Sequence, residues 1–384
     1  MRHYRGWIIL LISIFFLSGC WDRKEINDLA FITTTGIDKL GENEFRVSLQ
    51  IPLPSAMSSA SGGGGGTSGD KPYYVDSEIG RNIGEVYARL QQRMSREIFI
   101  AHRRVFVIGE KTAKGGMKQT LDAVFEQPAS RLSTLLVVAK GDALDILTSS
   151  PHLEQFPSEA IREISKNSIN VDVRNALDDI YKPGKDPVIP VVSSVKTENM
   201  GKDERQEVQM SNVAIFDDSK LKFITNRSET SGITWLLRKM KNKSINIPVK
   251  DDLEVDLRVL DYKIKTRYKV KNNLPEFTIK LHVSTALLQN EPKVQLEDIK
   301  QYKMLVEKME NEIKKQIDAV FNHAKSEGVD PFGLGYHVFQ RDNELWEEHL
   351  EQRWRELLKD VKVSVDVFGE IEKINIRTIK IQED

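Results

Sequence analysis

The first twenty residues constrain the processing and location of this chain more than any other stretch does. Arg2, His3 and Arg5 form a basic start, and residues 7–17 (WIILLISIFFL) are an apolar run that only Ser13 interrupts. This pattern predicts a secretory signal that is removed from the mature protein. The run is too short to stay as a membrane span, because crossing the hydrocarbon core takes roughly 20 apolar residues.

The residue that follows this run is the only cysteine of the chain. Ser18 and Gly19 are small, Leu17 precedes them and Cys20 comes directly after them. The order is typical of the lipobox of bacterial lipoproteins, so Cys20 is predicted to carry S-diacylglycerol and N-acyl groups once residues 1–19 are removed. The alternative is an incidental core cysteine. Two acyl chains hold a protein stably on a bilayer, which predicts a body anchored on the outer face of a cell membrane.

The remaining chain has the length and composition of a folded, multi-domain body. It is long for a single hydrophobic core, and no further apolar stretch approaches membrane-spanning length. The 56 Lys and Arg residues balance 57 Asp and Glu residues, so no overall field favours nucleic acid. The basic run at residues 238–241 is interpreted as a solvated helix end in preference to a binding patch.

A glycine-rich stretch divides the N-terminal part. Gly62 to Gly66 are consecutive within residues 54–72, and we interpret this stretch as a flexible surface loop. A phosphate-binding loop is the alternative, but it would need a strand before it and a helix with Lys-Ser or Lys-Thr directly after it.

Hydrophobic periodicity predicts alternating strands and helices up to residue 150. Residues 29–37 and 44–51 are typical of a hairpin, and Ser77 is a candidate N-cap for a helix over 77–95. Beyond residue 150, Pro190 favours an edge strand at 188–195. Further strands are predicted at 105–108 and 135–138, and helices at 117–126, 142–147, 158–165 and 173–181.

The C-terminal half is predicted to be strands packed on long helices. A hairpin over 208–216 and 220–225 and a helix over 228–241 come first, then two antiparallel strands over 253–270 and 276–288. A stripe from Ile299 to Ala324, closed by Gly328, predicts a long helix that covers a sheet; a coiled coil is the alternative. A helix over 343–358, with Trp346 and Trp354 as core residues or interface anchors, precedes strands at 361–367 and 371–381.

These elements predict a multi-domain α+β fold. Mixed α/β layers fill the N-terminal half, and an antiparallel sheet packs on long helices in the C-terminal half. The polar stretch 197–206 is the best boundary between them. The expected organisation is a removed signal at 1–19, an α/β domain at 20–150, a small helical subdomain and linker at 151–206, and an α+β domain at 207–384.

No constellation of residues supports catalysis, a cofactor or a metal. His102 is interpreted as a surface or locally hydrogen-bonded side chain in preference to a catalytic base. Ser219 and Lys222 match S-x-x-K without its companion motifs. The acidic group Asp251, Asp252, Glu254 and Asp256 lacks calcium-loop spacing and is expected on the solvent face of a strand. We therefore predict that the chain is not an enzyme.

Several stretches, in order along nearly the whole chain, resemble the Ger(x)C family of spore germination lipoproteins. They are residues 20–30 (CWDRKEINDLA), 36–38 (GID), 95–105 (SREIFIAHRRV), 214–216 (AIF), 229–232 (ETSG) with Trp235 and Leu236, and 330–335 (DPFGLG) followed by Trp346 and Trp354. The departures are the glycine run Gly62 to Gly66 and Pro331, where an aliphatic residue is more usual. Neither departure changes the residues that predict lipid attachment at Cys20.

The resemblance implies the C subunit of a nutrient germinant receptor on the outer surface of the spore inner membrane. Its implied partners are two membrane-spanning subunits, one permease-like and one with large soluble domains, and its implied role is non-enzymatic. Two alternatives come from other classes. One is a solute-binding lipoprotein that captures a small nutrient, and the other is a cell-wall enzyme.

Overall fold

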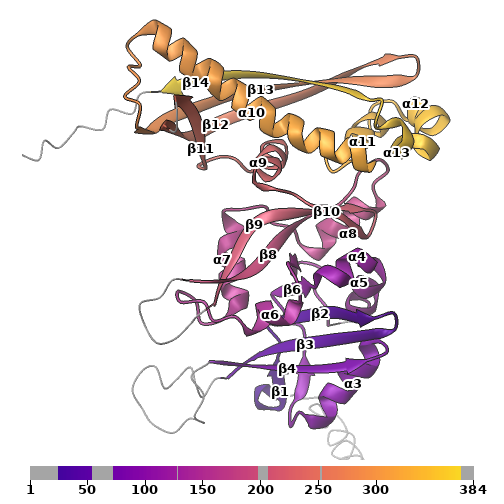
Figure 1. The fold of residues 1–384 in the computed structure, drawn as a ribbon. Coiled ribbons are helices and arrows are strands. Elements are labelled where there is room, and N and C mark those ends of the chain that lie inside the picture. The colour runs from indigo at the N-terminus through magenta and orange to yellow at the C-terminus, as the bar shows by residue number, and fades with distance from the viewer. Residues whose placement is uncertain (1–24, 54–71, 128, 198–205, 251–252, 373–384) are drawn as a thin grey trace, which may run out of the picture.

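The structure is a computed structural model (Figure 1). It describes residues 25–53, 72–127, 129–197, 206–250 and 253–372. The predicted signal, Cys20, the run Gly62 to Gly66, and Asp251 and Asp252 lie outside the described residues.

An eight-stranded sheet is the frame of the N-terminal part. Its order is β10-β9-β8-β7-β6-β2-β3-β4, with β8, β7, β6 and β2 parallel at the centre and antiparallel pairs at both ends. A separate parallel pair joins β1 (Leu29–Phe31) to β5 (Glu97–Phe99). The strands of the large sheet are β2 (Thr34–Gly41), β3 (Glu44–Pro52), β4 (Tyr73–Gly80), β6 (Val105–Ile108), β7 (Leu135–Ala139), β8 (Val188–Lys196), β9 (Gln206–Asp217) and β10 (Lys220–Ile224).

Helices cover both faces of this sheet, because its central strands are apolar at every position. β6 and β7 are buried throughout, as strands between two helical layers must be. Phe106 and Ile108 pack with α3, α5 and α8, whereas Val105 and Val107 pack with α6 and α7 on the opposite face. The helices are α3 (Ile83–Arg93), α4 (Glu110–Gly115), α5 (Lys118–Phe125), α6 (Ala143–Thr148), α7 (Pro157–Lys166) and α8 (Val173–Tyr181).

The helix expected over 77–95 starts later than predicted. Ser77 lies in strand β4, and the N-cap of α3 is Asn82, whose side chain accepts a hydrogen bond from the Glu85 N–H. Ile79 fits the helical spacing, but it is 39% exposed on the strand. The helical spacing predicted over 77–95 arose because the end of strand β4 and the start of helix α3 follow each other in the sequence.

The strand expected at an edge lies inside the sheet. β8 has β7 on one side and β9 on the other, so the prediction from Pro190 was wrong. Pairing with β7 runs only through Val191 and Val192, and the missing N–H of Pro190 stands just before it. A proline is tolerated there because it removes no bond from that short ladder.

The polar stretch 197–206 connects β8 to β9, which are antiparallel neighbours in one sheet. A cut at residue 206 would therefore separate two hydrogen-bonded strands. The predicted domain limits at 150 and 206 stay predictions, and any division of the chain has to accommodate this pairing.

A four-stranded sheet forms the C-terminal part, in the order β11-β12-β13-β14. The long β12–β13 hairpin is antiparallel, as predicted, but β14 runs parallel to β13. The sheet is therefore mixed, because the chain between β13 and β14 crosses over through several helices instead of a tight turn. The strands are β11 (Ser244–Lys250), which the sequence analysis missed, β12 (Leu253–Lys271), β13 (Leu274–Asn290) and β14 (Lys362–Glu372).

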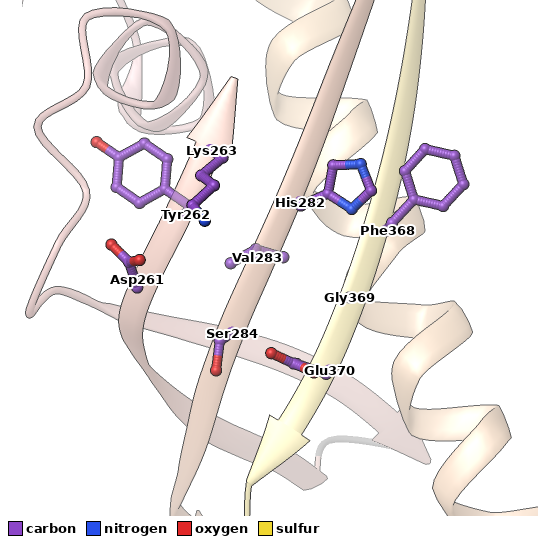
Figure 2. Close-up of a pocket in the computed structure, with 9 residues that line it drawn as sticks. All are labelled: Asp261, Tyr262, Lys263, His282, Val283, Ser284, Phe368, Gly369 and Glu370. Atoms are coloured by element: carbon purple, nitrogen blue, oxygen red, sulfur yellow. The ribbon is translucent and has the colours of Figure 1, made fainter. Parts of the chain in front are cut away.

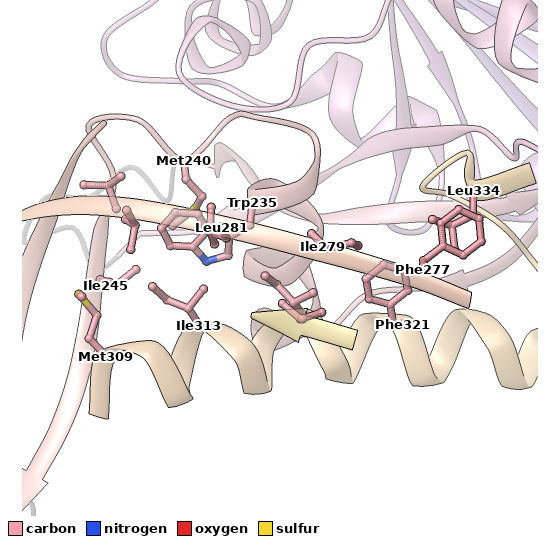
Figure 3. Packing of buried hydrophobic residues seen from close by; sticks show 14 of the residues in the cluster. Trp235, Met240, Ile245, Phe277, Ile279, Leu281, Met309, Ile313, Phe321 and Leu334 are labelled. Carbon is pink, nitrogen blue, oxygen red and sulfur yellow. The ribbon is translucent and has the colours of Figure 1, made fainter. Parts of the chain in front are cut away.

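One long helix, α10 (Ile299–Glu327), covers the inner face of this sheet (Figure 3). Met309, Ile313 and Phe321 project from it against Ile279 and Leu281 of β13. Gly328 ends the helix in the left-handed conformation with φ 69°, which glycine adopts at little cost. This confirms the helix that covers a sheet and contradicts the coiled-coil alternative.

The segment predicted as a helix over 343–358 is helical but irregular. It comprises α12 (Asn343–Leu345), a π turn at Trp346–Leu350, a 3-10 turn at Glu351–Arg353 and α13 (Trp354–Leu357). Trp346 and Trp354 are 1% and 4% exposed, with ring centroids 5.5 Å apart. Both tryptophans are therefore core residues, as the sequence analysis favoured.

A small buried cluster joins the two parts. Ile233 of α9 (Arg227–Leu236) and Val320 of α10 pack with Val213 and Ile215 of β9. The predicted helix over 228–241 ends early, because Arg238 turns the chain with φ 60°. α9 thus lies between the two sheets, as Figure 1 shows.

Candidate functional site

The one site residue predicted from the sequence, Cys20, lies outside the described residues, and its lipid stays a prediction. Within the described part of the chain, a group of charged side chains, two of them buried aspartates, lies where the two sheets meet. We define this junction by Asp186, Asp330 and Arg355 and the turn at Asp217 and Asp218.

Asp330 organises one side of the junction. Its side chain is buried and accepts hydrogen bonds from the Gly335 N–H at 2.8 Å and from Trp354 Nε1 at 3.1 Å. A third, longer bond of 3.2 Å comes from the Phe332 N–H. The DPFGLG stretch therefore wraps around its own first carboxylate, which holds Trp354 in place.

Close packing explains two glycines beside Asp330. A Cβ on Gly335 would stand 2.7 Å from Trp346 Cζ3 and 2.8 Å from the Gly184 Cα. Gly184 has φ 64° and faces Gly335 in return. The two backbones pack directly against each other here, so neither Gly335 nor Gly184 has room for a side chain.

Asp186 links Asp330 to the large sheet. Its carboxylate accepts the Asp330 N–H at 2.7 Å, and the Asp330 carbonyl accepts the Asp186 N–H at 2.9 Å. On the other side, the Asp218 N–H donates to Asp186 at 3.2 Å. Asp186 thus bridges the C-terminal loop and the β9–β10 turn.

Arg355 forms ion pairs with three acidic side chains of the junction. Its guanidinium lies 2.8 Å from Asp186, 2.8 Å from Asp217 and 3.2 Å from Asp218. These three carboxylates also lie close enough together to resemble a cation site. The positive charge among them is that of Arg355 itself, so the geometry describes an internal ion-pair network.

Burial shifts the acid–base behaviour of both buried aspartates. Burial raises the pKa of the Asp330 carboxyl to about 6, against the lowering effect of its hydrogen bonds from the protein backbone. Burial also raises the pKa of Asp186, and the Arg355 charge opposes that rise. Ionising these groups in the folded state is therefore costly, although both are well hydrogen-bonded.

We expect Asp330→Asn to change how stability depends on pH. The folded carboxyl binds its proton more tightly than the unfolded one, so its contribution to the free energy of unfolding is fully present below pH 3.8 and is lost as pH rises to about 6. Across this window the wild type should lose up to about 2–3 kcal/mol relative to the variant. Denaturant unfolding at several pH values measures the difference; parallel pH profiles would contradict the assignment.

A hollow of about 370 Å³ lies elsewhere, on the outer face of the C-terminal sheet (Figure 2). His282 stacks on Phe368 with ring centroids 4.8 Å apart, and Lys263 and Glu370 also line the hollow. Figure 2 shows these side chains projecting from three neighbouring strands. The hollow is open to solvent and lies on one sheet instead of between two lobes.

The other sequence candidates take no part in the ion pairs of the junction, although Ser219 directly follows Asp218 in its turn. His102 is exposed and contacts the ring of Phe31 edge-on and the ring of Phe99 at a tilt, which fits the surface interpretation. Ser219 and Lys222 lie on the β9–β10 hairpin, where Lys222 faces Glu327 at 3.8 Å. Of the acidic group, Glu254 is exposed on β12.

The basic run 238–241 is only partly a solvated helix end. Arg238, Lys239 and Lys241 are exposed, but Met240 is buried in the C-terminal core. The run belongs to the turn after α9, and its apolar residue anchors that turn.

No local sequence pattern marks the junction as a whole, although part of it lies in a motif named above. Asp330 stood within the DPFGLG motif, and Trp354 was assigned to the core. Asp186 and Arg355 carried no local signal, because the chain brings them together across 169 positions. The β9–β10 turn was predicted, but not what it contacts.

Another quoted motif, GID at 36–38, also has a structural role. Asp38 accepts the Ala143 N–H at 2.6 Å and the Leu144 N–H at 3.2 Å, and so caps α6 from a distant strand. A Cβ on Gly109 would collide with the Asp38 carboxylate. Burial raises the pKa of Asp38 to about 6.

Comparisons with known proteins agree with these motifs. The family described as spore germination protein N-terminal domain matches residues 22–194, and the one described as spore germination B3/GerAC like, C-terminal, matches residues 211–375. The putative spore germination protein YfkR of Bacillus subtilis (strain 168) is 31% identical, with 96% of each chain covered. Spore germination protein KC of the same organism is 26% identical, over 98% of this chain and 97% of that protein.

A solved structure shares the fold. The crystal structure of the GerBC protein matches with a TM-score of 0.55 and 15% sequence identity, and the match covers 88% of this chain and 96% of that one. The likeness confirms the multi-domain α+β architecture. With two family matches in order and a relative that covers nearly the whole length, this chain belongs to the Ger(x)C family of spore germination proteins.

Proposed function

We propose that this chain is a lipid-anchored, non-enzymatic subunit of a spore nutrient germinant receptor. Its lipid is on Cys20, its body stands on the outer face of the spore inner membrane, and it is needed for assembly or signalling of the receptor. Its partners are two membrane-spanning subunits, one permease-like and one with large soluble domains. The observation that carries this proposal is membership of the Ger(x)C family over nearly the whole chain.

Two features of the molecule support the proposal. The small residues before Cys20 are typical of a lipobox, and two acyl chains on Cys20 would hold the body stably on a bilayer. Within the described residues, no helix is both long and apolar enough to cross a bilayer. The junction also ties the two sheets together through Asp186, Asp330 and Arg355. A body joined in this way suits a subunit that transmits force or position between partners.

The solute-binding alternative gains no support from the hollow beside His282. That hollow lies on the open face of one sheet, whereas small-molecule sites usually enclose most of their ligand.

The lipid on Cys20 can be tested by mass spectrometry of the chain purified from spore membranes. We expect the mature N-terminal peptide to begin at Cys20 and to carry a diacylglycerol thioether. Cys20→Ala should abolish the lipid, leave the signal uncleaved and reduce co-purification with the membrane-spanning subunits. Ser18→Ala keeps a small residue before the cysteine and serves as the matched control.

Unmodified Cys20 in the mature wild-type chain would refute the anchor. Normal receptor assembly and normal nutrient response in the Cys20→Ala spores would separate the lipid from the proposed role.

A further inference from the structure

Strand β12 has a long unpaired edge in the C-terminal sheet. β11 pairs with it only as far as Arg258, whereas β13 pairs with it as far as Lys271. No strand in the described part of the chain pairs with the other side of β12 between these points. Figure 1 shows the β12–β13 hairpin reaching well beyond β11.

The backbone groups on this edge can be assigned from one contact. Arg238 Nη2 donates to the Ile264 carbonyl at 3.3 Å, so the backbone of Ile264 points away from β13. In an antiparallel pair the outward direction recurs at every second residue. Thr266, Tyr268 and Val270 therefore present their N–H and C=O groups along the open edge.

The turn of the hairpin agrees with this assignment. Asn272 and Asn273 have φ 52° and 57°, as in a two-residue type I′ turn. Such a turn makes Lys271 and Leu274 a hydrogen-bonded pair. The backbone groups of odd-numbered residues in this part of β12 therefore bond to β13, and those of even-numbered residues point to the open edge.

Cations line the outer face of the same stretch. Lys263, Lys265, Arg267 and Lys269 are all exposed, and Lys280 of β13 stands directly opposite Lys265. None of the five makes an ion pair with another described residue. Like charges opposite each other destabilise a sheet, as Lys265 and Lys280 are, whereas Lys269 stands opposite Glu276 and Lys280 has Asp366 opposite it on β14.

The side chains between these cations are of a different kind. Ile264, Thr266 and Tyr268 are half-buried on the inner face of the sheet, and Val270 is 45% exposed near the turn. A strand added to this edge would meet positive charge on one face and apolar or β-branched side chains on the other.

We propose that the edge of β12 from Thr266 to Val270 accepts an extended segment of a partner protein by strand addition. The segment carries acidic residues that alternate with apolar or β-branched ones. Backbone hydrogen bonds to the open edge supply affinity, and the cation stripe supplies selectivity. Alternate residues of a strand lie about 6.8 Å apart, so the acidic side chains of the segment match the spacing of the stripe.

The charges on the neighbouring strand argue against a membrane as the occupant. Asp366, Glu370 and Glu372 of β14 are exposed on the same face as the stripe. A planar anionic bilayer that met the face would also meet these carboxylates, whereas a single strand along β12 lies away from them. A second copy of this chain is disfavoured too, because it would bring the same stripe of lysines to the edge.

The test uses the full mature chain in detergent and a synthetic peptide in which Glu alternates with Val over about seven residues, a common strand length. We expect salt-sensitive binding and slower amide hydrogen exchange at Thr266 and Tyr268. Reversing the stripe charge with Lys265→Glu and Lys269→Glu should weaken binding about tenfold or more. Lys300→Glu with Lys303→Glu, exposed on α10, makes the same change in net charge and should bind normally.

Thr266→Pro tests the backbone part of the proposal, because it removes an outward N–H without removing a bond to β13. It should lose binding while its circular dichroism and melting temperature stay close to those of the wild type. If this variant unfolds, the amide hydrogen exchange of Thr266 and Tyr268 in the wild type with the peptide bound still tests strand addition.

Several results would overturn strand addition at this edge. They are unchanged exchange at Thr266 and Tyr268 with the peptide bound, equal weakening by the α10 charge reversal, and normal binding by folded Thr266→Pro. Tighter binding to phosphatidylglycerol vesicles than to the peptide, lost on Lys265→Glu and Lys269→Glu, would assign the stripe to lipid. These results bear on the edge alone, since the lipid on Cys20 is tested separately.

Discussion

Arg355→Met is expected to lower the free energy of unfolding by about 2–3 kcal/mol at neutral pH. The substitution leaves Asp186, Asp217 and Asp218 clustered without a cation, and Asp186 has a side-chain exposure of only 4%. Breaking a fully buried ion pair costs about 3–5 kcal/mol. The expected loss is smaller because 41% of the Arg355 side chain is exposed and solvent screens part of the repulsion.

A neighbouring arginine supplies the control. Arg353 faces Glu356 at 3.7 Å with 66% of its side chain exposed, so Arg353→Met should change stability by less than about 0.5 kcal/mol. Arg355→Met combined with Asp186→Asn should recover part of the loss, because one uncompensated charge is removed. Denaturant unfolding measures all three. Equal stability of the two single variants would show that the ion pairs at the junction contribute nothing.

The Arg355 variant also connects the junction to the proposed role. If the junction keeps the two sheets in one arrangement, proteolysis between them should become faster in Arg355→Met, and receptor assembly should fall with it. Faster proteolysis with normal assembly would mean that the partners tolerate a looser body.

Gly232→Val should destabilise the chain by about 3 kcal/mol or more, because it forces two helices apart. A Cβ at Gly232 of α9 would overlap the Gln316 carbonyl oxygen of α10 and stand 2.6 Å from the carbonyl carbon. Backbone atoms of a long helix cannot move aside as a flexible side chain could. The same contact carries the hydrogen bond from Trp235 Nε1 to Gln316 Oε1 at 3.3 Å.

The control for this substitution is another helical glycine. Gly84 lies on the exposed side of α3, and a Cβ added there would have Asn82 Oδ1 as its nearest neighbour, at 3.5 Å. Gly84→Ala should therefore stabilise the helix by up to about 1 kcal/mol. A loss below about 1 kcal/mol for Gly232→Val would mean that α9 and α10 can separate without disturbing the core.

Local patterns predicted most individual elements. The apolar runs at β6 and β7 are buried on both faces, whereas the stripe of α10 and the alternation along β12 each bury one face, so all four patterns are visible in the sequence. The failures occurred where the local pattern was ambiguous. Ser77 and Ile79 fitted a helical spacing while lying on β4, and Pro190 suggested an edge that the sheet does not have there.

The sequence by itself determined the type of most elements, the multi-domain α+β class and the family, because these depend on residues close together or on motifs in order. Only the tertiary structure decided the parallel place of β14, the interior place of β8 and the junction. Asp330 and Asp186 are 144 positions apart, and neither carries a mark of its partner. The physical reason is that a buried charge is compensated by whichever groups the packing brings near, and packing is a property of the whole chain.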